Sequence, residues 1–550
     1  MDAALRRVIL GASLGALFEW YDFFLYGSLS AVISRQFFAA ANETTSFIFA
    51  LLAFAAGAFV RPLGAIVFGR LGDLVGRKRT FLMTIVIMGS STFLVGCLPG
   101  YASIGVAAPV ILVALRLLQG LALGGEHGGA VIFVAEHTPP EVRGRHTAWV
   151  QTTGGAGLAL SLVVILLCQL ATGDAFTRYG WRIPFLLSAV LLAVSVYIRL
   201  HLNESPVFRQ MQREGSLSRT PLKEALGRWA NARIILVAIV VTSGMAVTAY
   251  TAHLYALLFM QRTLKIGATG AGLITAAGIV LATPCYFVAG ALSDRIGRKP
   301  VVLGGLLLSA LSASPLFHAL THYGNPALRR AMAEAPVTVI ADPAECSFQF
   351  DPVGRTAFTS SCDVAKSALA RAGVPYQNEA ASAGTVARVR IGAGARATYL
   401  ESISGQGVSQ ATFRPAAGRF GQALAAALRA AGYPADERPG QAHVLVLILI
   451  QACLVAVLAL TYAPLAPWLV ELFPPRIRYT SVSVSYHIAN GWFGAFLPAM
   501  AFAIVAGTGR IYSGLWYTVG FALLAFLVGV VYLPETNPRA NPALEPRTAG

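Results

Sequence analysis

The chain has 550 residues, of which 56% are hydrophobic and only 12% charged, and its mean hydropathy is +0.64. A soluble protein of this length would need far more polar surface, so these values exclude a soluble globular fold and indicate a helical membrane protein. The formal net charge of +17 does not indicate nucleic-acid binding, because the basic residues cluster mainly in short loops between apolar runs and show no aromatic and basic interleaving.

Twelve mostly apolar runs are each long enough to cross a bilayer whose apolar core is about 30 Å thick. The first run follows two arginines, as the apolar part of a signal peptide would, but it continues past residue 30 and contains acidic residues. We therefore interpret it as a retained first helix. The predicted spans are 8–33, 47–69, 80–99, 106–136, 147–170, 181–201, 232–260, 268–291, 300–323, 443–472, 479–506 and 511–533.

The distribution of Arg and Lys between the loops predicts the orientation of the spans. Alternate connections are rich in basic residues, which places them and both termini on the cytoplasmic side. Apart from the long segment 324–441, which holds the remaining basic excess, the opposite loops hold little: Arg35, Arg178, Arg262 with Lys265, and Arg510. The basic connections hold Arg70, Arg77, Lys78, Arg79, Arg143, Arg145, Arg209, Arg213, Arg219, Lys223, Arg228, Arg295, Arg298, Lys299, Arg476 and Arg478.

The same runs divide the chain into two six-helix bundles. Residues 1–201 form the N-terminal bundle, and a polar cytoplasmic linker that contains prolines follows at 202–231. The C-terminal bundle consists of 232–323, with helices seven to nine, and 442–536, with helices ten to twelve. A cytoplasmic tail is expected at 537–550.

Two acidic residues lie deep in the first span, within E-W-Y-D-F-F-L-Y-G at 19–27. Glu19, Asp22 and Tyr26 are spaced i, i+3 and i+7, so they share one face of a helix. An ionisable group inside a span is costly and therefore indicates function. The alternative is an aromatic belt with two acids near water, but these acids lie a dozen or more residues beyond Arg7. We predict that this face binds solute or carries protons.

A stretch of eleven residues then occurs twice, as G-R-L-G-D-L-V-G-R-K-R at 69–79 and as G-A-L-S-D-R-I-G-R-K-P at 290–300. Its glycines permit a sharp reversal, its basic residues hold the loop in the cytoplasm, and its aspartate can cap a helix or pair with a cation. The repeat predicts two halves built alike. The matching residues are Gly69 and Gly290, Leu71 and Leu292, Asp73 and Asp294, Gly76 and Gly297, Arg77 and Arg298, and Lys78 and Lys299.

This repeat resembles the loop between the second and third helices of major facilitator superfamily transporters and its weaker copy in their second half. In that family the loop acts as a gate latch, which implies a gating role for the matched residues. Glu471 and Arg478 flank another cytoplasmic turn, and we expect them to latch the gate too rather than to bind solute.

The fourth span contains R-L-L-Q-G-L-A-L-G-G-E-H-G-G-A, in which Arg116, Gln119 and Glu126 share a face, with His127 beside it. A buried Arg needs an anionic partner. Glu126 lies almost three turns away, so Glu19 or Asp22 of the first span is an alternative partner. The glycines permit close helix packing. His127 alone would more often be a structural hydrogen-bonding residue than a proton carrier.

The second half offers weaker solute-binding candidates. Tyr250 and His253 lie in the seventh span with Tyr255, and Tyr486 and Asn490 lie in the eleventh with Trp492. Aromatic residues in such spans more often pack than bind ligands.

Residues 324–441 are too long and too polar for a connection between spans nine and ten. Strand candidates at 336–341 and 385–391, with helix candidates near 364–372 and at 420–431, predict a small α+β insert outside the cytoplasm. There Cys346 and Cys362 can form a disulfide that closes a loop of about 17 residues and contributes roughly 3 kcal/mol; two unpaired thiols are the alternative. Cys97, Cys168, Cys285 and Cys453 lie in apolar runs and are interpreted as packing residues.

Several motifs together resemble the metabolite:proton symporter family of the major facilitator superfamily. They are those of spans one and four, G-W-R-I-P-F at 180–185, E-S-P-V-F at 204–208 and E-L-F-P-P-R-I-R-Y-T at 471–480. The resemblance covers about 1–323 and 442–536, and the insert departs from the short loop usual there. It implies twelve transmembrane helices in two bundles and inward transport of a small metabolite, such as a dicarboxylate, citrate, 2-oxoglutarate, shikimate, proline or betaine, with a proton.

We therefore expect a secondary active transporter in the bacterial cytoplasmic (inner) membrane that takes up an organic acid or zwitterion with a proton by alternating access. Its partners would be the bilayer, the solute and the proton, with no nucleic acid and no cofactor. The alternatives are a proton-coupled exporter or drug antiporter of the same superfamily, and a solute sensor that uses the insert. An enzyme is not expected, because the insert has no metal-ligand spacing, nucleophile motif or phosphate loop. Solute identity, proton stoichiometry and oligomeric state, a monomer included, stay open.

Overall fold

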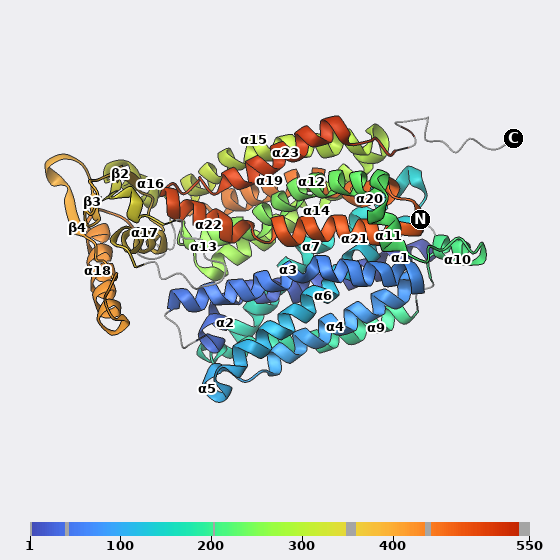
Figure 1. Cartoon of the computed structure of the whole chain (residues 1–550), viewed down its shortest axis with the longest axis horizontal. Coiled ribbons are helices and arrows are strands. Elements are labelled where there is room, and N and C mark those ends of the chain that lie inside the picture. The colour runs from blue at the N-terminus through green and yellow to red at the C-terminus, as the bar shows by residue number, and fades with distance from the viewer. Residues whose placement is uncertain are drawn as a thin grey trace.

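A computed structural model describes residues 3–38, 43–201, 204–347, 359–434, 442–537 and 539. Eleven helical stretches in this part of the chain are long and apolar enough to cross a membrane. The helix α3 (Glu43–Val75), which packs along α6 (Ala107–Glu136), is the twelfth. The predicted all-α membrane fold is confirmed. Figure 1 shows the first half as the lower, blue to teal layer and most of the second half as the upper, green to red layer.

The first half packs closely because glycines replace side chains where helices cross. A Cβ at Gly120 of α6 would collide with the carbonyl oxygen of Gly57 in α3, so the two backbones touch. The remaining helices are α1 (Ala3–Ser28), α2 (Ser30–Phe37), α4 (Arg77–Cys97), α5 (Tyr101–Ile104), η1 (Pro140–Val142), α7 (Arg143–Thr172), η2 (Gly173–Phe176), η3 (Gly180–Arg182), α8 (Ile183–Leu186) and α9 (Ser188–Leu200), followed by α10 (Pro206–Arg213) and α11 (Pro221–Gly227).

Two spans of the second half are interrupted where a continuous α-helix was expected. The π-helical turns η4 (Thr251–Tyr255) and η8 (Ala489–Gly494) divide the seventh and eleventh spans, and such turns often occur at functional sites. The other helices are α12 (Trp229–Tyr250), α13 (Ala256–Arg262), α14 (Ala268–Ile296), α15 (Arg298–Gly324), α19 (Val444–Tyr462), α20 (Leu465–Leu472), η7 (Pro475–Ile477), α21 (Arg478–Ile488), α22 (Leu497–Thr508) and α23 (Leu515–Tyr532).

The insert contains a four-stranded sheet of order β2-β1-β3-β4, in which only β1 and β2 are parallel. It lies at one end of the molecule, opposite the linker helices α10 and α11 (Figure 1). Its elements are α16 (Pro326–Glu334), β1 (Val337–Ala341), η5 (Pro343–Glu345), α17 (Ser361–Ala372), β2 (Gln377–Ala380), β3 (Arg388–Ile391), η6 (Gly394–Arg396), β4 (Thr398–Glu401) and α18 (Gln410–Ala430).

Cys346 and Cys362 are joined by a disulfide, as expected, and it ties the loop after β1 to the first turn of α17. Two strands were not predicted, because β2 and β4 are short, lie at the sheet edges and are largely exposed, so they carry no alternating pattern. Helix α18 begins ten residues before the predicted 420, because Pro415 lies in its second turn and does not interrupt it.

The disulfide and the orientation of the insert can be tested together by thiol labelling in a background without the other four cysteines. In intact cells, a membrane-impermeant maleimide should label Cys346 and Cys362 only after reduction. The variant Cys362→Ser should be labelled without reductant, because it leaves the half-buried Cys346 as a free thiol.

Labelling of the native pair without reductant would show that Cys346 and Cys362 are not joined by a disulfide. Labelling of the Cys362→Ser variant only after membrane rupture would overturn the periplasmic placement of the insert.

Candidate functional site

The acidic face of the first span is buried between helices of the first half. Glu19, Asp22 and Tyr26 on α1 are each at most 5% exposed. The Ser188 hydroxyl donates a hydrogen bond to Asp22 Oδ1 at 2.5 Å. The Tyr26 ring lies under the guanidinium of Arg116, 4.2 Å from its centroid. The first and fourth spans therefore meet through these residues.

Arg116 lies within a polar network on α6. Its guanidinium donates to the side-chain oxygen of Gln119, whose nitrogen donates to Thr92 Oγ1 at 2.9 Å. The predicted residues Glu126 and His127 have side chains that lie outside the described residues.

Arg61 is a buried residue of α3 that our sequence interpretation did not single out. It is 0% exposed, its guanidinium lies 4.1 Å from the centroid of the Phe23 ring, and its Nη1 donates to the Tyr250 hydroxyl at 3.4 Å. The contact with Tyr250 crosses from the first half to the second. The signal was present in the sequence, because Arg61 interrupts the apolar run at 47–69.

The two π-helical turns present polar residues to a cavity between the halves. Tyr250, His253 and Asn490, three of the weaker candidates, line it. Nε2 of His253 and both polar side-chain atoms of Gln151 have no hydrogen-bond partner in the described part of the chain, so they are available to a solute. The other lining residues are Trp20, Phe24, Gly154, Ala249, Tyr286, Leu458 and Tyr462.

Three aromatic candidates have other surroundings. Tyr486 is buried but does not line this cavity. The Tyr255 ring stacks on Phe317 with centroids 5.5 Å apart. Trp492 is 42% exposed, and its indole nitrogen donates to the Phe59 carbonyl at 3.1 Å. Tyr255 and Trp492 therefore pack, as most aromatic residues in such positions do.

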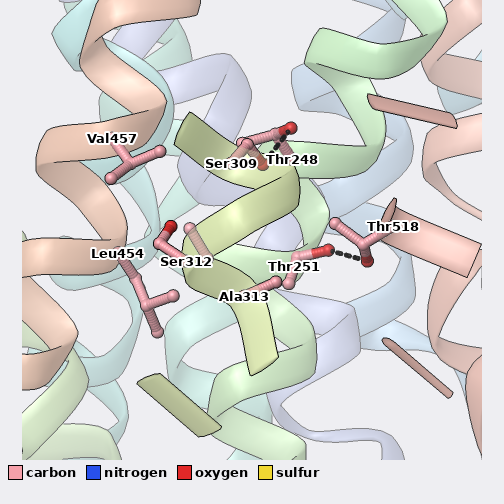
Figure 2. Close-up of a pocket in the computed structure, with 9 residues that line it drawn as sticks. Thr248, Thr251, Ser309, Ser312, Ala313, Leu454, Val457 and Thr518 are labelled. Carbon is pink, nitrogen blue, oxygen red and sulfur yellow. Dashed lines mark hydrogen bonds between the residues drawn. The ribbon is translucent and has the colours of Figure 1, made fainter. Parts of the chain in front are cut away.

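A second, hydroxyl-lined cavity lies beside η4, entirely within the second half (Figure 2). Thr248 and Ser309 are hydrogen-bonded at 2.9 Å, and Thr251 and Thr518 at 2.7 Å. These pairs attach the interrupted seventh span to α15 and α23. They satisfy hydroxyl groups that would otherwise be costly in an apolar interior.

At the end of the molecule that carries the linker helix α11, Asp73 of the first repeat caps a helix of the opposite half. Its carboxylate accepts hydrogen bonds from the backbone nitrogens of Tyr479 at 3.3 Å and Thr480 at 3.0 Å, at the start of α21. Arg77 lies 3.6 Å from Asp73, and Arg77 also lies 3.8 Å from Glu136. A carboxylate at a helix N-terminus is stabilised by the helix dipole.

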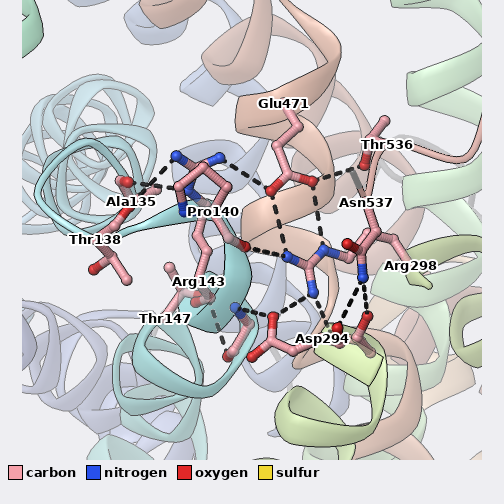
Figure 3. Close-up of polar contacts among 12 residues, drawn as sticks. Ala135, Thr138, Pro140, Arg143, Thr147, Asp294, Arg298, Glu471, Thr536 and Asn537 are labelled. Carbon is pink, nitrogen blue, oxygen red and sulfur yellow. Dashed lines mark hydrogen bonds and ion pairs between the residues drawn. The ribbon is translucent and has the colours of Figure 1, made fainter. Parts of the chain in front are cut away.

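The second repeat makes the equivalent contact between the halves (Figure 3). Asp294 accepts hydrogen bonds from the backbone nitrogens of Gly144 at 2.8 Å and Arg145 at 2.9 Å, at the start of α7 in the first half. Arg298 forms ion pairs with Asp294 at 2.5 Å and with Glu471 at 3.3 Å. Both repeats therefore join the two halves at the same end of the molecule.

Glu471 and Arg478 contribute to different clusters rather than to one. Glu471 pairs with Arg143 at 3.0 Å, whereas Arg478 pairs with Glu136 at 3.0 Å. Glu136 was not among the predicted residues. Each ion pair again crosses between the halves.

The glycines and lysines of the repeat shape its turns. Gly76 and Gly297 both have φ of 108°, a value that suits glycine, where one helix reverses into the next. Gly69 and Gly290 lie at close crossings, since a Cβ at Gly290 would lie 2.6 Å from the Gly144 oxygen. The ammonium groups bond to helix-end carbonyls, Lys78 to Leu200 at 2.8 Å and Lys299 to Val530 at 2.9 Å.

Two further glutamates occupy equivalent positions in the two halves, and the sequence interpretation did not name them as site residues. Glu204 accepts hydrogen bonds from the backbone nitrogens of Arg77 and Lys78, and Glu535 from those of Arg298 and Lys299. They cap α4 and α15 in equivalent positions. The sequence signal is a glutamate followed closely by proline after the sixth and twelfth spans, in E-S-P and E-T-N-P.

Comparison with known proteins gives a consistent result. The family of sugar (and other) transporters matches residues 8–267 and 402–541. The shikimate transporter of Escherichia coli K12 is 37% identical over 57% of this chain and 72% of its own length. The proline/betaine transporter of the same strain is 35% identical over 58% of this chain and 65% of its own length, so the alignment spans just under two thirds of that relative. The solved proton:xylose symporter XylE superposes with a TM-score of 0.60, covering 97% of both chains at 16% identity, which shows a shared fold.

The two aspartate caps predict a shared effect on the closure of the bundle at this end. Asp73→Asn or Asp294→Asn should loosen it, because an amide carries no charge and offers one acceptor oxygen fewer to the helix end. Ser483 is 0% exposed, so a single cysteine introduced by Ser483→Cys reports on the closure. In the aspartate variants this cysteine should react with a maleimide roughly 2- to 30-fold faster than in the parent chain, the range expected for loss of a helix cap.

Glu401→Gln on the exposed surface of the insert is the matched control and should leave the rate unchanged. Equal rates in the aspartate variants and the parent chain would contradict the latch.

Proposed function

The chain belongs to the sugar (and other) transporter family of the major facilitator superfamily, and we propose that it takes up an organic acid or zwitterion together with a proton by alternating access. The observation that carries this proposal is the set of four buried charged residues within the spans, Glu19, Asp22, Arg61 and Arg116, of which Arg61 bonds to Tyr250 at the cavity between the halves. Such charges inside a membrane bundle are costly and are kept where ions or protons move.

The solute class follows from the chemistry of that cluster. A buried guanidinium suits a carboxylate, because its planar donors can form two parallel hydrogen bonds. Relatives are named for shikimate, proline or betaine, and alpha-ketoglutarate, and each of these solutes carries a carboxylate. We assign the first contact with that group to Arg116.

The membrane orientation is part of the same proposal. The basic connections and both termini face the cytoplasm of a bacterium, with the chain in the inner membrane and the insert in the periplasm. The latches around Asp73 and Asp294 close the cytoplasmic side, so the conformation described above corresponds to a state in which solute does not leave to the inside.

Coupling follows from competition for Arg116. Before solute arrives, Arg116 is balanced by a protein carboxylate, with Asp22 and Glu126 as candidates ahead of Glu19. A solute carboxylate displaces it, and a carboxylate without a cation in an apolar site favours its protonated form. The neutralised site crosses between access states more cheaply than a charged one. Release of the solute returns Arg116 to the carboxylate and expels the proton.

Single substitutions test this scheme in proteoliposomes. Arg116→Lys should abolish transport, because a point charge does not replace the two-pronged guanidinium. Asp22→Asn, Glu126→Gln and Glu19→Gln should separate coupling from binding: the true proton carrier, once neutralised, should still exchange solute in counterflow but no longer accumulate it against its gradient.

The control Arg178→Lys, on the exposed periplasmic side, should behave as the parent chain does. If all three acid variants still accumulate solute uphill in a pH-dependent way, the coupling scheme is wrong.

A further inference from the structure

Arg61 is a buried cation with incomplete hydrogen bonding. Nε and Nη2 have no partner among the described residues, and Nη1 makes only the 3.4 Å bond to the Tyr250 hydroxyl. A buried guanidinium with two unsatisfied nitrogens is costly, unless an anion completes it during the working cycle.

The position of Arg61 favours the solute as that anion. Tyr250 lines the cavity between the halves, so the guanidinium lies one hydrogen bond from it. Gly491 of η8 packs on the same turn of α3, since a Cβ there would lie 2.5 Å from the Ala58 oxygen and 3.5 Å from Arg61 Cβ. Asn490, the neighbour of Gly491, also lines the cavity.

We propose that Arg61 is a specificity-determining residue that binds the solute carboxylate from the α3 side, with the neutral Tyr250 hydroxyl occupying its place when the site is empty. This inference rests on the proposed function. It gives the two arginines distinct tasks: Arg116, which is engaged by Gln119, makes the first contact with the carboxylate, and Arg61, which retains two free donors among the described residues, sets the preference for it.

The test compares a transported monocarboxylate with its uncharged amide analogue in proteoliposomes. Arg61→Gln should raise KM for the carboxylate by about 10- to 100-fold, the range for losing hydrogen bonds to a charged group, and leave KM for the amide nearly unchanged. Arg61→Lys should restore part of the preference, because it retains the charge. The control Arg178→Gln should leave both values unchanged.

Equal losses for both solutes would make Arg61 a structural residue. Loss of uphill accumulation with an unchanged carboxylate KM would assign Arg61 to a protein carboxylate instead. Each result overturns the inference and leaves the proposed function standing, whereas failure of the parent chain to carry any carboxylate would reject the proposed solute class itself.

A separate observation concerns the insert, which caps the end of α22. Four successive carbonyl oxygens accept hydrogen bonds from it: Ala506 from the Tyr376 hydroxyl, Gly507 from Lys366 at 3.5 Å, Thr508 from Asn378 at 3.1 Å and Gly509 from the Tyr376 backbone at 2.8 Å. The last carbonyls of a helix have no partner within it, and a cation near them is favourable.

The insert also contacts the end of α13, through the C-terminal end of α17. Lys265, in the connection after α13, donates to the carbonyl of Arg371 near the end of α17 at 3.2 Å. Gly373 has φ of 67°, and a Cβ there would lie 2.7 Å from the Arg262 oxygen. Since α13 follows η4 and α22 follows η8, the segment from α17 to β2 bridges the outer parts of the two interrupted spans.

We infer that this segment is a strut that makes α13 and α22 move as one body when the cavity opens. Hydrogen exchange of the full-length chain in lipid nanodiscs tests the coupling from both ends. Gly373→Ala perturbs only the α13 contact, yet it should speed exchange at 504–510. The pair Tyr376→Phe and Asn378→Ala perturbs only the α22 contact, yet it should speed exchange at 262–266.

The matched control is Arg388→Ala on the exposed face of β3, which should alter neither segment. If each variant affects only its own end, the insert caps two helices separately and is no strut. The exchange rate of β1 reports whether the insert stays folded. If one variant unfolds the insert, the result of the other variant decides whether α13 and α22 are coupled.

Discussion

Carboxylates that cap helices of the opposite half are the contacts that join the two halves at the end of the molecule near the linker helix α11. Asp73 holds the start of α21, and Asp294 holds the start of α7. Each aspartate is paired with the arginine four residues later, so the charge that binds the helix end is itself balanced by its own half. Such a contact exists only while the two halves meet. The repeat thus places one helix-capping carboxylate in each half, and each of them holds a helix of the other half.

The fold was predictable because a bilayer leaves few choices. Apolar length sets the spans, Arg and Lys set their orientation, and the duplicated loop shows the two halves. The interruptions at η4 and η8 were not predictable, because a π-helical turn depends on what packs against it. Gly494, for example, leaves room for the Tyr250 ring, since a Cβ there would lie 2.7 Å from that ring.

The candidate site was predictable only in part, for a similar reason. The cost of burying a charge identified Glu19, Asp22 and Arg116, and the same rule would have identified Arg61. It says nothing of Gln151, Tyr286 or Tyr462, which line the cavity. Uncharged polar residues are common in spans, and a single sequence does not show which face of a helix meets the other half. The partners of the latch, such as Glu136, come from distant segments whose meeting is set by the tertiary fold.

The charge count of the buried cluster connects binding to coupling. Among its described side chains, Arg61 and Arg116 contribute two positive charges, and Glu19 and Asp22 two negative charges, so these four groups together are formally neutral. A monoanionic solute would leave one negative charge in an apolar seam, and one proton on a carboxylate restores neutrality. A zwitterion adds no net charge, so a proton taken up with it would leave the site positive. If neutrality governs passage between access states, a monoanion requires one proton per cycle, and a site with two arginines favours an organic acid over a zwitterion.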